Sequence, residues 1–231
     1  VITDLTSAAD AMSLIDAANT GAVTVDVLDT ADNVAAEVTG IGNTLDDLDE
    51  AADVVVSGGD VTAAEAAAIQ QISEYNDSAS DYDITDTAAA LISATDSVLN
   101  VDGVDTVSVT GGPVDADTGE KLAELSKDVE FDVLDDANAV AAEVTGSNAA
   151  GDLDEANTVV VSDGDVTAAE AAAIQSISGY NDSASDYDIT DTAAALISAT
   201  DSVLDKAGVD TVSVTGGPVL ADTGEKLAEL S

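Results

Sequence analysis

The feature that most constrains this 231-residue chain is a long internal duplication. Residues 60–99 recur at 165–204 with only two changes, which gives a period of about 105 residues. Self-similarity at a fixed period is typical of repeat architectures, in which each unit buries its apolar face against its neighbours. We therefore expect a single repeat array over 1–231, with a first long block at 25–128 and a second at 129–231.

Within each block, short runs with β propensity alternate with alanine-rich runs whose apolar residues recur at three- and four-residue spacing. Expected strands include 54–56, 82–84 and 107–110, and expected helices include 63–73 and 87–99. Parallel strands need a crossover connection, and such crossovers are right-handed in about 98 % of cases. The sequence therefore predicts an α/β fold, a right-handed β/α solenoid of about eight or nine strand–helix coils with a parallel sheet on one side.

A doubly wound α/β domain is the main alternative, because it also alternates strands and helices at this spacing. Such a sheet reverses its strand order and gives its strands unequal environments. Near-identical blocks are satisfied more easily where every coil has equivalent neighbours, so the duplication favours the solenoid.

Local signals mark where helices begin. Thr62…Glu65 and Thr167…Glu170 have the spacing of capping boxes, and Asp117…Glu120 and Asp222…Glu225 resemble them. Several aspartates lie where a strand gives way to a helix, and we expect their carboxylates to accept hydrogen bonds from helix N-terminal amides. These residues are Asp29, Asp86, Asp135, Asp136 and Asp191.

The charge balance excludes several classes of function. The chain has 48 acidic residues against four basic ones, for a net charge of −44, and it has no histidine or cysteine. Nucleic acids and anionic membranes are bound by basic residues, so neither is an expected partner, and no apolar run is long enough for membrane insertion. Without histidine, cysteine or an aromatic-lined sugar cleft, we expect no enzyme and no catalytic residues.

One acidic loop recurs unchanged in both blocks, at 76–83 and 181–188. Calcium takes about six to eight oxygen ligands, and the loop concentrates carboxylates outside the expected caps, although it lacks the spacing of an EF-hand. The simpler interpretation is a solvated acidic loop that holds no specific ion. The candidate calcium ligands are Asp77, Asp81 and Asp83 in the first block and Asp182, Asp186 and Asp188 in the second.

The strings at 60–69, 82–92 and 105–112 resemble the Asp/Thr/Ala-rich repeats of giant secreted and cell-surface proteins of marine bacteria, cyanobacteria included. The similarity spans nearly the whole chain. It implies an extracellular structural or adhesive role, often with type I secretion, although the glycine-rich nonapeptide calcium repeat that commonly accompanies such proteins is absent here.

We therefore expect a non-catalytic, secreted or cell-surface structural segment, such as a surface-layer element, filament subunit or adhesin spacer, with an acidic surface that binds cations in salty surroundings. The alternative is a calcium-dependent adhesin or binding module, and an acidic DNA mimic is a weaker third reading. The first residue, Val1, fits a processed product or a fragment. Because no divergent polar cap closes either end, we expect self-association end to end or contact with neighbouring repeats.

Overall fold

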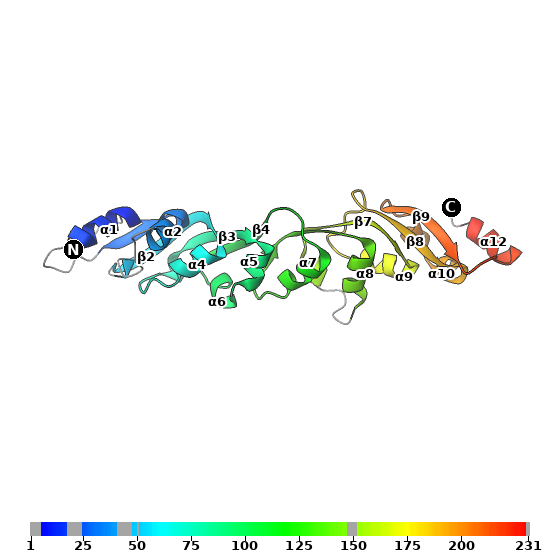
Figure 1. Ribbon diagram of the computed structural model, residues 1–231, viewed down its shortest axis with the longest axis horizontal. Helices are drawn as coiled ribbons and strands as arrows, with labels where there is room; N and C mark the ends of the chain where they lie inside the picture. Colours follow the sequence, from blue (N-terminus) through cyan, green and yellow to red (C-terminus); the bar gives the residue numbers. More distant parts are fainter. Residues whose placement is uncertain (1–5, 18–24, 41–47, 50, 147–151, 230–231) are drawn as a thin grey trace. The chain divides into compact units, whose positions relative to one another are not determined.

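The computed structural model describes residues 6–17, 25–40, 48–49, 51–146 and 152–229 (Figure 1). The chain divides into two compact units. The N-terminal unit comprises 1–111 and 125–129, and the C-terminal unit comprises 112–124 and 130–231. The single array over 1–231, with blocks at 25–128 and 129–231, stays a prediction.

In the N-terminal unit, strands and helices alternate along the chain. Its elements are α1 (Ala8–Ala17), β1 (Asp26–Asp29), α2 (Ala31–Thr39), β2 (Asp53–Val61), α4 (Ala63–Ile69), the 3₁₀ helix η1 (Asp77–Ala79), β3 (Asp81–Thr87), α5 (Ala88–Ser93), α6 (Asp96–Leu99), β4 (Val104–Thr110) and, at the boundary between the units, β5 (Val129–Glu130).

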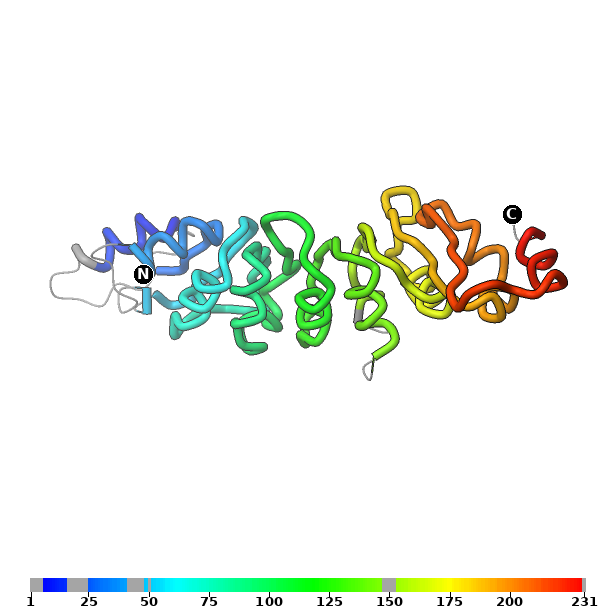
Figure 2. The backbone as a smooth tube through the Cα atoms, turned by 45° about the vertical axis from the view of Figure 1, so that its right-hand side comes forward, coloured from blue at the N-terminus to red at the C-terminus, as the bar shows by residue number. Residues whose placement is uncertain are grey.

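The C-terminal unit repeats the order of α-helices and strands, but its 3₁₀ helix lies one strand–helix pair earlier. It contains α7 (Ala116–Ala123), β6 (Asp132–Asp135), α8 (Ala137–Thr145), the 3₁₀ helix η2 (Asp152–Glu155), β7 (Thr158–Val166), α9 (Ala168–Ile174), β8 (Asp186–Thr192), α10 (Ala193–Ser198), α11 (Asp201–Leu204), β9 (Val209–Thr215) and α12 (Ala221–Ala228). The tube in Figure 2 follows these strand–helix pairs in chain order.

The strands form two parallel sheets, so the predicted α/β class is confirmed. One sheet has the order β1-β2-β3-β4-β5 and the other has the order β6-β7-β8-β9. Each strand therefore lies beside its sequence neighbours, and the order reversal that defines a doubly wound sheet is missing from the strands that the structure describes.

The core of each unit is thin and aliphatic, and it lies between the sheet and its helices. In register, Val27 pairs with Val54, and Ile84 pairs with Val107, and all four side chains are fully buried. Alternate residues point away from the core, as the period of two along a strand requires. The helices contribute mostly alanine and single larger residues such as Ile69, so sheet and helix approach closely.

Both predicted capping boxes are confirmed, at Thr62 with Glu65 and at Thr167 with Glu170. The predicted caps at Asp117 and Asp222 are wrong, because both helices begin one residue before these positions.

The N-cap of α7 is Asp115, whose carboxylate accepts a hydrogen bond from the Thr118 amide at 2.8 Å. In the second block Leu220 takes this place and makes no side-chain cap bond. Asp136 caps α8 as predicted.

The remaining predicted caps accept from a helix earlier in the chain. Asp86, at the end of β3, accepts from the Ala63 amide at the start of α4, and Asp191 accepts from Ala168 in the same way. Asp29 and Asp135 repeat the arrangement on α1 and α7. The second oxygen of each carboxylate accepts from the amide of the next residue, at Thr30, Thr87, Asp136 and Thr192. One aspartate thus links two successive strand–helix pairs.

Candidate functional site

The repeated acidic loop has a structural role in its central residues. The Ser80 hydroxyl is buried, accepts a hydrogen bond from the Val56 amide of β2 at 3.0 Å and donates to the Asn76 carbonyl at 2.7 Å. The Asn76 side chain donates to Asp53 at 3.0 Å. Asn181 and Ser185 take the same places in the second block. The loop therefore satisfies the amide of Val56, the residue before β2 begins to pair with β3 at Ser57.

The structure gives the three predicted ligands of the first loop separate surroundings. Asp77 is exposed in η1 and accepts from the Ser78 amide at 2.7 Å. Asp81 is exposed at the start of β3, and Asp83 accepts from the amide and hydroxyl of Thr106 on β4. Asp83 also lies opposite Asp60 of β2, so two like charges face each other across neighbouring strands.

The second loop repeats this arrangement with one addition. Asp186 is exposed and Asp188 accepts from the Thr211 amide at 2.9 Å, as in the first block. Asp182, however, forms an ion pair with Lys206, with 3.3 Å between the charged atoms. The first block has Val101 where the second has Lys206. Among the described residues, therefore, only the second loop has a lysine paired with one of its aspartates.

A buried tyrosine hydroxyl lies beneath each loop. The hydroxyl oxygens of Tyr75 and Tyr180 have no hydrogen-bond partner among the described residues. Burial raises the pKa of both hydroxyls above the ordinary tyrosine value. Gly103 and Gly208 leave the space that these hydroxyls occupy, since a Cβ atom on either glycine would lie 2.3 Å from the oxygen.

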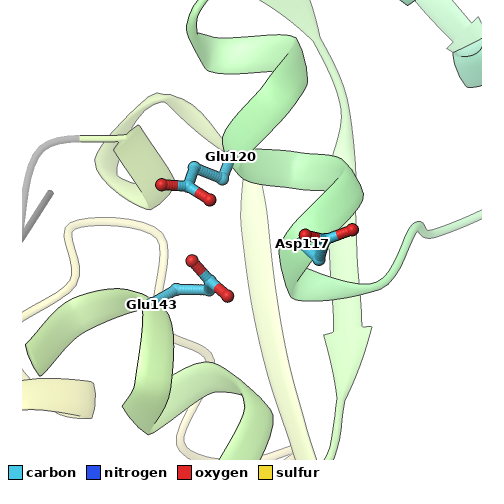
Figure 3. A group of neighbouring side chains, drawn as sticks. All are labelled: Asp117, Glu120 and Glu143. Atoms are coloured by element: carbon cyan, nitrogen blue, oxygen red, sulfur yellow. The ribbon is translucent and has the colours of Figure 1, made fainter. Parts of the chain in front are cut away.

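The tightest group of carboxylates lies elsewhere, between α7 and α8 (Figure 3). Asp117 and Glu120 project from α7, and Glu143 projects from α8. Their carboxylate oxygens all lie within 4.8 Å of one another, and in the described part of the chain no other acidic trio meets this distance. The six predicted loop ligands therefore lie outside the closest carboxylate group.

Electrostatic repulsion acts within this trio. The pKa of Glu143 lies above the ordinary glutamate value, because of its burial first and the neighbouring Glu120 carboxyl second. Lys121 pairs with Asp117 one helical turn away and offsets part of the charge. Three carboxylates at this spacing are hard oxygen ligands of the kind that calcium and magnesium accept.

Sequence reasoning read Asp117 and Glu120 as a helix start and missed this trio. The spacing of three residues placed both side chains on one helix face. Glu143 joins them only because α8 packs beside α7, and no local pattern states that contact.

The comparisons with known proteins give no match: no family model, curated protein or solved structure matches the chain. In the described residues, no helix combines the length and apolar character that crossing a membrane requires.

Proposed function

We propose that this chain is a non-catalytic structural segment of an extracellular repeat protein, in which successive strand–helix pairs stack as a right-handed β/α solenoid. Its role is structural: it keeps other parts of an assembly apart and presents a surface, as a spacer, surface-layer element or filament subunit. The bacterial repeat proteins that the sequence resembles support a location outside the cell.

The observation that carries this proposal is an aspartate at the end of one strand that caps the helix of the preceding strand–helix pair. Asp29, Asp86, Asp135 and Asp191 each complete the N-terminus of the preceding helix. Such a bond needs a helix to lie beside the end of the strand in the following pair, and successive pairs in a linear stack lie side by side in this way. The sequential parallel strand order within each sheet supports the same arrangement.

The acidic surface gives the segment its dependence on cations. A net charge of −44 disfavours any compact state through self-repulsion, and dissolved salt screens that repulsion. We expect circular dichroism to show weakened structure at about 0.01 M ionic strength, where the Debye length is about 30 Å, and recovery at about 1 M, where it is about 3 Å. Equal thermal stability in both solutions would contradict this part of the proposal.

Insertion of a further block tests the stacking directly. A chain in which residues 60–164 are present twice in tandem should fold with unchanged helix and strand signals per residue. Its maximum dimension in small-angle X-ray scattering should grow in proportion to the added block, because a stack lengthens along one axis. A compact particle whose radius grows only as expected for a globular domain would overturn the solenoid.

The carboxylate trio favours a second candidate function, a calcium-dependent adhesin or binding module. In that case calcium would bind between α7 and α8 and rigidify this part of the chain. Isothermal titration with calcium at constant ionic strength distinguishes the two proposals. Saturable binding that Glu143→Gln abolishes supports the second function, whereas equal stabilisation by sodium at matched ionic strength supports screening alone.

A further inference from the structure

Two helices of this protein have the same eight-residue sequence and different surroundings. Both α7 and α12 read Ala-Asp-Thr-Gly-Glu-Lys-Leu-Ala. In α7 the residues Ala116, Gly119 and Leu122 are buried, whereas the structure buries no residue of α12. The sequence of α12 is therefore suited to a contact that it does not make within the described chain.

The segment that leads into α12 is also unusually apolar at its surface. The exposed fractions are 43 % for Val212, 44 % for Val214, 41 % for Val219 and 80 % for Leu220. Leu220 stands where the first block has Asp115, so a capping carboxylate is replaced by an exposed leucine. This exchange lowers the stability of an isolated helix and adds apolar surface, which suits a contact face.

The C-terminal unit shows how the α7 sequence is covered. Its partner surface consists of β6 and α8. The Val114 amide donates to the Asp132 carbonyl at 2.8 Å, and the Leu134 amide donates to the Val114 carbonyl at 2.9 Å. The Ala116 amide then donates to the Asp135 carboxylate at 2.9 Å.

The N-terminal unit presents nearly the same partner surface on β1 and α2. Both β1 and β6 read Asp-Val-Leu-Asp, and α2 differs from α8 at two positions. Here α1 occupies the place of α7. Thr6 exchanges two backbone hydrogen bonds with β1, and the Ala8 amide donates to Asp29 at 3.0 Å.

We propose that α12 of one molecule binds β1 and α2 of a second copy in place of α1, so that copies join head to tail. Val219 takes the backbone bonds of Thr6, and the Ala221 amide donates to Asp29. The α7 contact inside the chain is the template for this interface. The inference rests on the proposed structural function and names the surface through which that function is exercised.

The helix glycine decides the fit of this interface. A Cβ on Gly119 would lie 2.9 Å from Val133, 3.2 Å from Leu153 and 3.2 Å from Phe131, so only glycine fits the template. The corresponding atom on Gly224 would meet nothing nearer than Val219, at 3.8 Å. A larger residue at position 224 is therefore harmless to the single molecule and obstructs the proposed contact.

The two partner surfaces differ at one buried residue. The place of Phe131 is taken by Val25, which leaves room for Ala11 of α1 where α7 has glycine. As a result α1 fits β1 and α2 well. To bind this surface, α12 must displace α1, which belongs to the same chain as the surface. Association is therefore expected at high protein concentration.

Charge opposes the same contact. Asp222 and Glu225 of α12 would meet Glu37 of α2, which reproduces the trio of Asp117, Glu120 and Glu143 at the interface. Each molecule also carries a net charge of −44. Association should therefore strengthen with salt.

Sedimentation velocity of the full chain, over a range of concentrations in salt, tests the proposal with Gly224→Leu as the key variant. The expected result is concentration-dependent association of the natural chain and a monomeric variant, with matching circular dichroism spectra and melting curves. Association that Gly224→Leu leaves unchanged would overturn the proposed interface. A wild-type chain that stays monomeric, with a scattering profile that still lengthens on block insertion, would overturn the interface and leave the structural function standing.

Val25→Phe provides the opposite change. It reproduces the template pocket for the α12 glycine and crowds Ala11, so α12 gains over α1. We expect association at a concentration about tenfold lower, which Gly224→Leu in the same chain abolishes. No increase in association would overturn the proposal.

Discussion

The Asp86 carboxylate accepts a hydrogen bond of 3.1 Å from the Ala63 amide, which lies 23 positions earlier in the chain. Its other oxygen accepts from Thr87 at 2.7 Å. One side chain at the end of β3 thus completes the N-terminus of α4 and holds the entry to α5. The same relationship recurs at Asp191 with Ala168.

Asp86→Ala should lower the free energy of unfolding by about 0.5–2 kcal/mol, because the first amide of α4 loses its acceptor. Urea denaturation followed by circular dichroism measures the change. Removing any carboxylate also relieves repulsion, so Asp102→Ala, an exposed site in a turn, serves as the charge-matched control. Equal midpoints for the two variants would show that the cap contributes nothing.

Stability should be greatest in mildly acidic solution. Burial raises the pKa of Asp29, but hydrogen bonds from Asn33, Ala8 and Thr30 outweigh it and lower the pKa overall. Hydrogen bonding from Thr118 lowers the pKa of Asp115. A carboxyl with a depressed folded pKa contributes stability above its unfolded value, about 3.9, and this contribution is lost as pH falls through the folded value.

Glu143 acts in the opposite direction, because its raised pKa means that the folded state binds the proton more readily. Its repulsion is relieved as pH falls toward that value. We therefore expect the urea midpoint to rise from pH 7 to about pH 5 and to fall below about pH 4. Glu143→Gln should flatten the upper part of this profile, and a midpoint that only decreases on acidification would refute the expectation.

Gly103→Ala should destabilise the fold by about 1–3 kcal/mol through overpacking. The new methyl group would lie 2.3 Å from the Tyr75 hydroxyl oxygen and 3.0 Å from the Asp77 carbonyl oxygen. Tyr75→Phe alone should be neutral or stabilising, because it removes a buried hydroxyl that lacks a partner.

The double variant should cost less than the sum of the two single changes, since the phenylalanine removes the atom that the methyl group strikes. Thermal melts of the four proteins supply the cycle. Strict additivity would place the strain somewhere other than at the hydroxyl.

The two acidic loops should differ in calcium affinity. Lys206 already neutralises part of Asp182, whereas the first loop has Val101 at the corresponding place. Calorimetric titration should show that the first loop binds calcium more tightly. This tighter binding should disappear when Asp77 and Asp81 are replaced with Asn. Lys206→Val should then bring the second loop to the affinity of the first, and two identical sites in the natural chain would contradict this prediction.

The sequence predicted the alternation of strands and helices because each element carries its own periodicity, as in the buried alternation around Ile84. It predicted the capping boxes because Thr62 and Glu65 lie within one helical turn. It missed the partner of Asp86 because that bond joins residues 23 positions apart. It also missed Glu143 as the neighbour of Glu120, since their proximity depends on how α7 and α8 pack.

The backward direction of the aspartate caps has a consequence for how the chain is made. When α4 has emerged from the ribosome, Asp86, whose carboxylate completes it, has still to emerge. The helices α1, α4, α7 and α9 are therefore completed only after the following strand has emerged, so their completion lags one strand–helix pair behind synthesis. A pause in synthesis before that strand emerges leaves the N-terminus of such a helix without its carboxylate acceptor.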